Sequence, residues 1–299
     1  MEAAMNSHRN ELIVVTGAST GMGAATAKEL SRRGFHVLAG VRREVDADAL
    51  RADGIEPQIL DITVESDVAA IADRVARDPR PLRALINNAG IAINSPVETL
   101  PLAQWRRQFE VNLFGHIALT QALLPALLDS SGTVVNISSV GGKVVLPTYG
   151  AYAGSKFAFE AASDALRREV ADLGVKVVVL EPGAVKTAMP GRGIATAQGL
   201  IADMSPAQLA RYGELNAAVT AQARSFLESG VPAEHAARVI ARAATARRPR
   251  TRYTIGRDAA VLVRLSRVMP DRMLDSIVRR NLRSFADSAP SQQRQLSRG

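Results

Sequence analysis

The chain has 299 residues, 47% hydrophobic and 22% charged, which suffices for a large core and excludes wholesale disorder. The absence of cysteine excludes disulfides, thiolate nucleophiles and cysteine-bound metals, and the four histidines are scattered, so we expect no metal site. The net charge of +8 is uneven: residues 242–299 carry +10 (14 Arg, 4 Asp), and residues 1–241 carry −2 (23 Lys and Arg, 25 Asp and Glu). Proteins that bind nucleic acids more often carry basic residues interleaved with aromatic ones over a binding face, and aromatic residues are only 4% here. We therefore expect no nucleic-acid partner.

Short runs rich in β-branched residues alternate with longer helical patterns over the first 180 residues. The predicted strands are Leu12–Val15, His36–Gly40, Glu56–Leu60, Ala84–Ile86, Thr133–Ile137 and Lys176–Leu180. The predicted helices include Gly21–Arg33, Glu65–Arg77 and Tyr149–Asp172. The alternation predicts an α/β fold: a doubly wound parallel sheet with helices on both faces and ligands at the carboxyl ends of the strands.

The stretch Val111–Leu128 contains no charged residue and reaches the length at which a membrane span becomes a candidate. Polar residues recur in it at helical spacing, and Gly115 and Pro125 interrupt it. We therefore expect a buried or subunit-interface helix of a soluble protein.

The regular alternation ends after Thr187. Residues 188–231 predict an irregular insertion that lies over the sheet and covers the substrate, and a last strand follows at Tyr253–Ile255. Residues 1–257 are thus expected to form one catalytic domain. Residues 258–299 are expected to form a basic helical extension whose polar end, from Ser284, is disordered.

A glycine-rich turn, Thr16-Gly17-Ala18-Ser19-Thr20-Gly21-Met22-Gly23, joins the first predicted strand to the first predicted helix. Glycines allow a pyrophosphate to approach the backbone, and the helix N-terminus supplies free N–H groups and a partial positive charge. The pattern favours phosphate binding over a purely structural turn.

Tyr152 and Lys156 are four residues apart and lie on one face of a predicted helix. A free tyrosine has a pKa of about 10, too high for acid–base catalysis near neutrality, and an adjacent ammonium stabilises its phenolate. Tyr149 has no such partner, because Ala153 stands four residues beyond it. We expect Tyr149 to line the mouth of a substrate site.

Taken together, the glycine turn, Asn87-Asn88-Ala89-Gly90, Ser139, Tyr152-x3-Lys156 and Pro182-Gly183 with Thr187 resemble the short-chain dehydrogenase/reductase family over roughly residues 10–257. The resemblance implies a Rossmann-type sheet of about seven strands, a nicotinamide cofactor and an oxidoreductase acting on an alcohol or carbonyl. It also implies a homodimer or homotetramer, formed through the helices that carry Asn112 and Tyr152.

The resemblance further implies a catalytic set of Asn112, Ser139, Tyr152 and Lys156. Strand alternation sends Ser138 and Ser139 to opposite faces, and the family spacing of thirteen residues before the tyrosine selects Ser139. Asn112 could instead be an interface residue. The implied substrate contacts are Ser139, Tyr149 and Tyr152. The implied cofactor contacts are Gly17, Ser19, Thr20, Gly21, Met22, Gly23, Arg42, Arg43, Asp61, Ile62, Asn88, Ala89, Gly90, Tyr152, Lys156, Pro182, Gly183, Val185 and Thr187.

The end of the second predicted strand bears on the cofactor. NAD-specific sites usually place an acid there, whereas this chain has Val41 followed by Arg42 and Arg43. Arg42 can bind a 2′-phosphate bidentately, so we expect NADP(H) rather than NAD(H). A solvated basic turn is the alternative. Asp61 matches the family residue that contacts the adenine amine, and its alternative role is a helix N-cap.

The residues 139–142 and 152–160, with the C-terminal extension, are most similar to the hydroxysteroid and retinol dehydrogenase branch. This similarity implies a bulky lipophilic alcohol, ketone or aldehyde as substrate. A 3-oxoacyl thioester or a small xenobiotic carbonyl is the alternative. A non-catalytic nucleotide-sensing protein would lack the tyrosine or the lysine, and both are present.

The predicted helices Asp258–Met269 and Asp271–Arg283 each carry an apolar stripe beside several arginines. Such helices can lie on an anionic membrane, or their stripes can pack on the body or a partner subunit. Residues 1–11 lack the apolar core of a signal peptide, so we expect a cytoplasmic protein, with peripheral membrane contact as an option. The excess of arginine over lysine favours a bacterial source.

Overall fold

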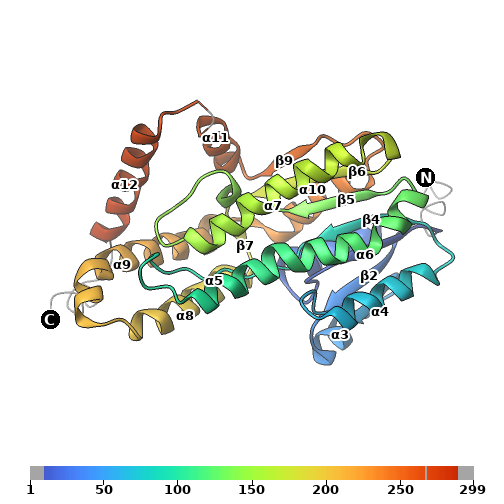
Figure 1. The fold of residues 1–299 in the computed structure, drawn as a ribbon, viewed down its shortest axis with the longest axis horizontal. Coiled ribbons are helices and arrows are strands. Elements are labelled where there is room, and N and C mark those ends of the chain that lie inside the picture. Colours follow the sequence, from blue (N-terminus) through green and yellow to red (C-terminus); the bar gives the residue numbers. More distant parts are fainter. Residues whose placement is uncertain (1–9, 267, 289–299) are drawn as a thin grey trace.

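A seven-stranded, wholly parallel sheet forms the centre of the computed structural model, which describes residues 10–266 and 268–288 (Figure 1). The strand order is β3-β2-β1-β4-β5-β6-β9. The order reverses between β1 and β4, which is where doubly wound sheets bind ligands. The bounds are β1 Leu12–Val15, β2 His36–Val41, β3 Ile55–Ile59, β4 Leu82–Asn87, β5 Thr133–Ile137, β6 Lys176–Pro182 and β9 Arg252–Ile255. The predicted α/β fold is confirmed.

Helices cover both faces of this sheet (Figure 1). One face packs against α2 (Gly21–Arg32), α3 (Glu44–Leu50) and α10 (Ala233–Thr245), and the other packs against α4 (Glu65–Ala76), α6 (Gly115–Asp129) and α7 (Gly150–Glu169). Alternation within a strand divides the two cores. In β1, for example, Ile13 and Val15 belong to the first core and Leu12 and Val14 to the second.

The helix α5 (Leu102–Phe109) continues through a π-helical turn, Glu110–Phe114, into α6. Of the residues described, this stretch alone is long and apolar enough to cross a membrane. Its inner face, with Leu119, Leu123 and Leu127, is fully buried against the sheet. The predicted buried helix is therefore confirmed, whereas its part in a subunit interface stays a prediction.

The segment after Thr187 corrects the sequence analysis. It consists of two helices, α8 (Ala188–Ala202) and α9 (Pro206–Ser229), instead of irregular chain. Thr187 caps α8, while Ser205 opens α9 with a capping box followed by proline. The prediction gave weight to the glycines and overlooked these caps. A two-residue pairing of β7 (Val185–Lys186) with β8 (Val231–Pro232) closes the segment at its base.

The C-terminal helices α11 (Arg257–Leu265) and α12 (Asp271–Ser288) lie at one end of the molecule (Figure 1). The helix α12 packs on α9, where Gln222 Nε2 donates to Asn281 Oδ1 at 2.6 Å. Because α12 extends to Ser288, the expected disorder from Ser284 is wrong for residues 284–288, and residues 289–299 lie outside the described part.

The edge strand β3 contains a proline, Pro57. On either side of it, Gly54 O accepts from Val37 N at 2.9 Å and Leu60 N donates to Val41 O at 2.8 Å. Since successive backbone groups alternate in direction, Pro57 occupies a position that faces away from β2. Its missing N–H therefore costs the sheet no hydrogen bond.

Candidate active site

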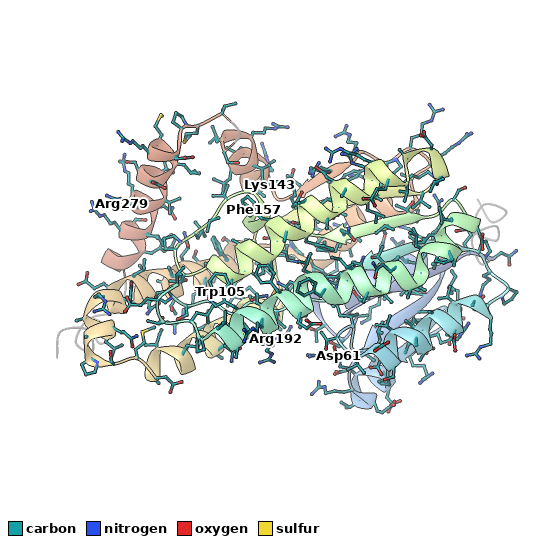
Figure 2. The ribbon with its side chains drawn as sticks, in the orientation of Figure 1. Asp61, Trp105, Lys143, Phe157, Arg192 and Arg279 are labelled. Atoms are coloured by element: carbon teal, nitrogen blue, oxygen red, sulfur yellow. The ribbon has the colours of Figure 1, made fainter. Side chains whose placement is uncertain are left out.

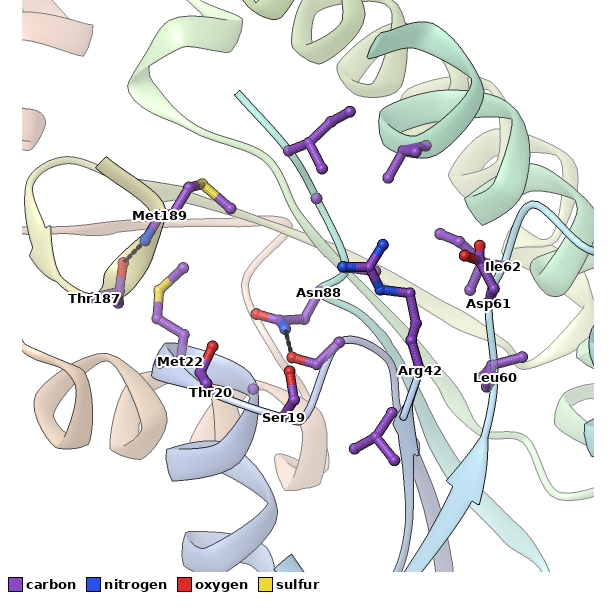
Figure 3. A pocket seen from close by; sticks show the side chains of 18 of the residues that line it. Ser19, Thr20, Met22, Arg42, Leu60, Asp61, Ile62, Asn88, Thr187 and Met189 are labelled. Atoms are coloured by element: carbon purple, nitrogen blue, oxygen red, sulfur yellow. Dashed lines mark hydrogen bonds between the residues drawn. The ribbon is translucent and has the colours of Figure 1, made fainter. Parts of the chain in front are cut away.

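A pocket lies at the carboxyl ends of β1, β2 and β4, as predicted (Figure 3). The pocket is open to solvent. Thirteen of the predicted cofactor residues line it: Gly17, Ser19, Thr20, Gly21, Met22, Gly23, Arg42, Asp61, Ile62, Asn88, Ala89, Gly90 and Thr187. Six further lining residues were not predicted as contacts, namely Val41, Leu60, Ile91, Val111, Met189 and Arg192.

The glycine turn forms one wall of this pocket. Gly17 and Gly21 have φ of +62° and +58°, which favour glycine. A Cβ on Gly23 would lie 2.3 Å from Gly17 O, so the turn and α2 meet too closely for a side chain. Thr20, the N-cap of α2, forms no side-chain cap, which leaves N–H groups of the first helical turn for a ligand. These features fit the phosphates of a dinucleotide.

The loop after β4 is attached to this turn by side-chain hydrogen bonds. Thr16 Oγ1 accepts from the backbone N–H groups of Asn88 and Ala89, each at 2.9 Å. Asn88 Nδ2 donates back to Thr16 O at 2.8 Å and Gly17 O at 3.2 Å. The floor and one wall of the pocket are therefore a single hydrogen-bonded unit.

The two arginines that follow β2 have different surroundings. Arg43 is held by Asp46, with Nε and Nη2 donating to its carboxylate at 2.8 and 2.7 Å, and it does not line the pocket. Arg42 points into the pocket (Figure 3) and makes no hydrogen bond or ion pair with the described residues. The geometry thus favours Arg42 alone as a cofactor contact.

Asp61 lines the pocket while its Oδ1 accepts from Thr63 N at 3.0 Å and Thr63 Oγ1 at 2.7 Å. The N-cap of α4 is Val64, so the alternative role of Asp61 as the N-cap is wrong.

Tyr152 and Lys156 lie on α7, next to the end of β5. Lys156 is 4% exposed, and its Nζ donates to Ile137 O at 2.8 Å. Burial lowers the pKa of Lys156 to about 8, while the Glu160 carboxylate acts in the opposite direction. Burial raises the pKa of Tyr152, and a hydrogen bond with Ser139 lowers it. The phenol is therefore protonated near neutrality and can serve as an acid.

Ser139 and Ser138 diverge as strand alternation predicts. Ser139 Oγ accepts from Gly141 N at 3.0 Å and is on the side of Tyr152. A Cβ on Gly141 would lie 3.0 Å from Tyr152 Cε1 and 3.4 Å from Ser139 Oγ, whereas Ser138 Oγ lies 2.7 Å from the Cβ position of Gly142, which is near Glu160. The structure therefore brings Ser139, and not Ser138, to the tyrosine.

Asn112 lies in the π-helical turn and is fully buried. Its Oδ1 accepts from Ile91 N at 2.9 Å, and its Nδ2 donates to Ile91 O at 3.0 Å and Ser155 Oγ at 3.2 Å. Since it is enclosed within one chain, its interpretation as an interface residue is wrong. It joins the loop after β4 to the helix that holds Tyr152 and Lys156.

Tyr149 stands just before α7, with its ring edge-on to Tyr152 at 6.1 Å between centroids. Burial is the main cause that raises its pKa to about 12, so it stays protonated. Thr148 before it has φ +68°, a strained conformation for a β-branched residue. The position is compatible with the predicted mouth of a substrate site.

Several predicted cofactor residues lie outside the pocket lining: Arg43, Tyr152, Lys156, Pro182, Gly183 and Val185. Pro182 pairs with Ile255 and Val185 with Val231, while a Cβ on Gly183 would lie 2.8 Å from Ala259 Cβ. These last three residues fix the course of the chain that brings Thr187 to the pocket.

A buried ionic cluster beside Lys156 was missed. Glu160 Oε2 accepts from Lys143 Nζ at 2.8 Å and Arg252 Nη2 at 3.0 Å, and Arg252 Nε lies 3.4 Å from Glu181 Oε1. The cluster joins the loop after Ser139, α7, β6 and β9. Its one sequence signal is the placement of Glu160 a helical turn after Lys156.

His116 was also missed as a site residue. Its Nε2 lies 2.8 Å from Ala89 O, and its ring stacks on Phe159 with centroids 5.0 Å apart. Burial, aided by the Lys156 cation, lowers its pKa to about 3. His116 is therefore neutral and fixes the loop of Ala89 against α7.

The burial of Lys156 predicts a pH effect on stability. Above a pKa of about 8 the folded protein loses this proton, while the unfolded chain keeps it until about 10.4. Within that window the unfolded state binds more protons, so stability rises with pH. From pH 7.5 to 9.5 the free energy of unfolding of the parent protein should rise by about 1–2 kcal/mol relative to Lys156→Met.

Urea unfolding at the two pH values measures this difference. Lys186→Met, which removes an exposed lysine, is the matched control and should follow the parent. The same pH dependence in parent and Lys156→Met would contradict the prediction.

The comparisons with known proteins agree with this geometry. A family model described as short chain dehydrogenase matches residues 11–197. The chain is 42% identical over 177 residues to the uncharacterized oxidoreductase YbbO of Escherichia coli, covering 58% of this chain and 66% of that one. It is 33% identical to an NADPH-dependent 3-dehydrocapnine reductase of Ornithobacterium rhinotracheale (92% and 99% covered) and 36% identical to human retinol dehydrogenase 16 (90% and 88%).

Among solved structures, a short chain dehydrogenase of Burkholderia cenocepacia in complex with NADP superposes with a TM-score of 0.69 at 25% identity, covering 88% of this chain and 94% of that one. The matched segment contains the glycine turn, Ser139, Tyr152, Lys156 and Thr187. The protein described here therefore belongs to the short-chain dehydrogenase/reductase family of NAD(P)-binding oxidoreductases.

Proposed function

We propose that this protein is an NADP(H)-dependent oxidoreductase that interconverts an alcohol and a ketone or aldehyde on a bulky lipophilic substrate. The observation that carries the proposal is the grouping of Ser139, Tyr152 and buried Lys156 at the end of β5, the strand that pairs with β4, whose following loop lines the pocket. The three side chains supply a hydrogen-bond donor, an acid and a cation for one carbonyl oxygen.

In the reducing direction, Ser139 and Tyr152 hydrogen-bond to the carbonyl oxygen of the substrate. The glycine turn and the loop after β4 would hold NADPH, which when bound would supply the hydride for the carbonyl carbon. Tyr152 gives its proton to the oxygen, and the Lys156 ammonium stabilises the phenolate that remains. Asn112 keeps α7 and the loop of Ile91 in register. Oxidation of the alcohol reverses these transfers.

The acid role of Tyr152 is tested with Tyr152→Phe. NADPH consumption, followed by its absorbance with a panel of lipophilic ketones and aldehydes, should fall about 10²–10⁴-fold. Tyr253→Phe is the matched control, because Tyr253 lies in β9, its hydroxyl accepts from Arg250 N at 3.0 Å, and its loss should leave most activity. Both variants should still gain thermal stability on binding NADPH. Undiminished turnover by Tyr152→Phe would refute the role.

The preference for NADP(H) is supported by Arg42, which faces the pocket and whose side chain makes no hydrogen bond or ion pair with the described residues, and by apolar Val41 at the usual place of an acid. The NADPH dependence named for the Ornithobacterium relative is in line with it. Arg42→Gln should weaken NADPH binding about 10–100-fold and leave NADH binding unchanged. Calorimetric titration measures both.

Arg43→Gln is the control for that experiment, since Asp46 already holds Arg43. It should leave the binding of both cofactors unchanged. An equal loss of NADPH and NADH binding in Arg42→Gln would show that the arginine does not recognise the 2′-phosphate.

A lipophilic substrate is supported by the composition of α8, which contains one charged residue, Arg192, and several apolar residues including Met189, Leu200 and Ile201. Relatives named as retinol dehydrogenases align over nine tenths of the chain. A 3-oxoacyl thioester or a small xenobiotic carbonyl is the alternative, and the same substrate panel separates the classes.

A homodimer or homotetramer is supported by exposed apolar side chains on α5, on the π-helical turn that follows it and on α7. Leu102, Phe114 and Phe157 are all exposed in the single chain. Burial of such side chains between copies would remove apolar surface from water. Light scattering of the protein gives the copy number.

Peripheral membrane contact of a cytoplasmic protein is supported by the C-terminal helices. Val261, Val268, Met273 and Ile277 are exposed, and arginines flank them, with Arg279 pointing away from the body (Figure 2). Co-sedimentation with anionic vesicles should drop several-fold in Met273→Ser/Ile277→Ser. Equal sedimentation of parent and variant, or none of the parent, would exclude this contact.

A further inference from the structure

The pocket has two positively charged side chains in its lining, Arg42 and Arg192, and one acid, Asp61. Arg42 follows β2 and is assigned above to the 2′-phosphate. A dinucleotide also carries a pyrophosphate with two negative charges. The glycine turn offers the pyrophosphate backbone N–H donors but no cationic side chain. Of the two arginines in the pocket lining, Arg192 is therefore the one available to bind the pyrophosphate.

The start of α8 meets the glycine turn directly. A Cβ on Gly21 would lie 3.1 Å from Thr187 Cβ, and Thr187 Oγ1 accepts from Met189 N at 3.4 Å as the cap of α8. The N-termini of α2 and α8 therefore open toward one pocket. Both helix ends favour an anion there.

Arg192 follows in the second turn of α8. The next residue, Gly193, packs so that a Cβ would lie 3.5 Å from Ala92 O, and Met189 Cε lies 3.7 Å from the Cβ position of Gly90. These contacts fix α8 against the loop after β4. They leave Arg192 in the pocket lining, on the same side of the molecule as Asp61 (Figure 2).

The backbone O of Arg192 accepts from Thr196 Oγ1 at 3.0 Å, but its side chain makes no hydrogen bond or ion pair with the described residues. Arg192 is the one charged residue of α8. Arg211 of α9, by contrast, is paired with Glu98, and Arg224 of α9 lies outside the pocket lining. An exposed arginine without a partner contributes nothing evident to the fold. Its planar fork is suited to phosphate oxygens.

We propose that Arg192 binds the pyrophosphate of the dinucleotide from the side opposite the glycine turn and so links α8 to the bound cofactor. The proposal rests on the proposed function of the pocket. It assigns Arg192 and Arg42 to different phosphates of one cofactor. Ligands that contain only one of these phosphate groups therefore distinguish the roles of the two arginines.

The test is calorimetric titration of the full-length protein with NADPH, NADH and 2′-AMP, which has the 2′-phosphate but no pyrophosphate. Arg192→Gln should weaken NADPH and NADH about equally, on the order of 10-fold, and leave 2′-AMP unchanged. Arg42→Gln should instead weaken the binding of NADPH and 2′-AMP and leave the binding of NADH unchanged. Arg192→Lys, which keeps the charge, should bind more tightly than Arg192→Gln.

Arg238→Gln, an exposed arginine of α10 outside the pocket lining, is the matched control. Suppose that the parent binds both dinucleotides. If Arg192→Gln then binds them as tightly as the parent does, or loses affinity for NADPH but not for NADH, the proposal for Arg192 is wrong while the proposed function stands. If the parent binds neither dinucleotide, the proposed function fails, and this inference fails with it.

Discussion

A cation enclosed at the carboxyl edge of the sheet is the constraint around which the site is built. Lys156 is charged, almost fully buried and within hydrogen-bond distance of the last carbonyl of β5. A buried ammonium is costly unless acceptors and counter-charges surround it. Glu160 supplies that counter-charge and is itself held by Lys143 and Arg252. The same ion pairs therefore fix the loop after Ser139 against α7, so that serine, tyrosine and lysine keep one arrangement.

A chain of hydrogen bonds connects this cluster to the cofactor pocket. It runs from the glycine turn through Thr16 and Asn88 to the loop after β4. From that loop, Ala89 O contacts His116 and Ile91 is held by Asn112, which also reaches Ser155 of α7. The glycine turn, the floor of the pocket and α7 are thus coupled by hydrogen bonds. Such coupling is what a reaction between two bound molecules requires, because small displacements of the reacting groups cost much of the rate.

Much of this arrangement follows from the sequence because its signals are local. β-Branched runs predicted the strands, and the spacing of Tyr152 and Lys156 predicted their shared helix face. What was missed is non-local or depends on side-chain choice. Glu160 and Arg252 are 92 positions apart, and nothing near either one indicates the pairing. Arg42 and Arg43 are neighbours with the same chemistry, and only the contact with Asp46 separates them. Arg192 went unnoticed because α8, which carries it, was predicted as irregular chain.

The proline in β3 has a consequence for how copies of this protein can associate. An exposed edge of a sheet is a template on which another strand can add, unless a donor on that edge is missing. Pro57 removes such a donor at the middle of the outer edge without weakening the pairing with β2. Continuous extension of the sheet from one molecule into the next, the route to fibrous aggregates, is hindered at this edge. The association through helical surfaces proposed above does not use this edge.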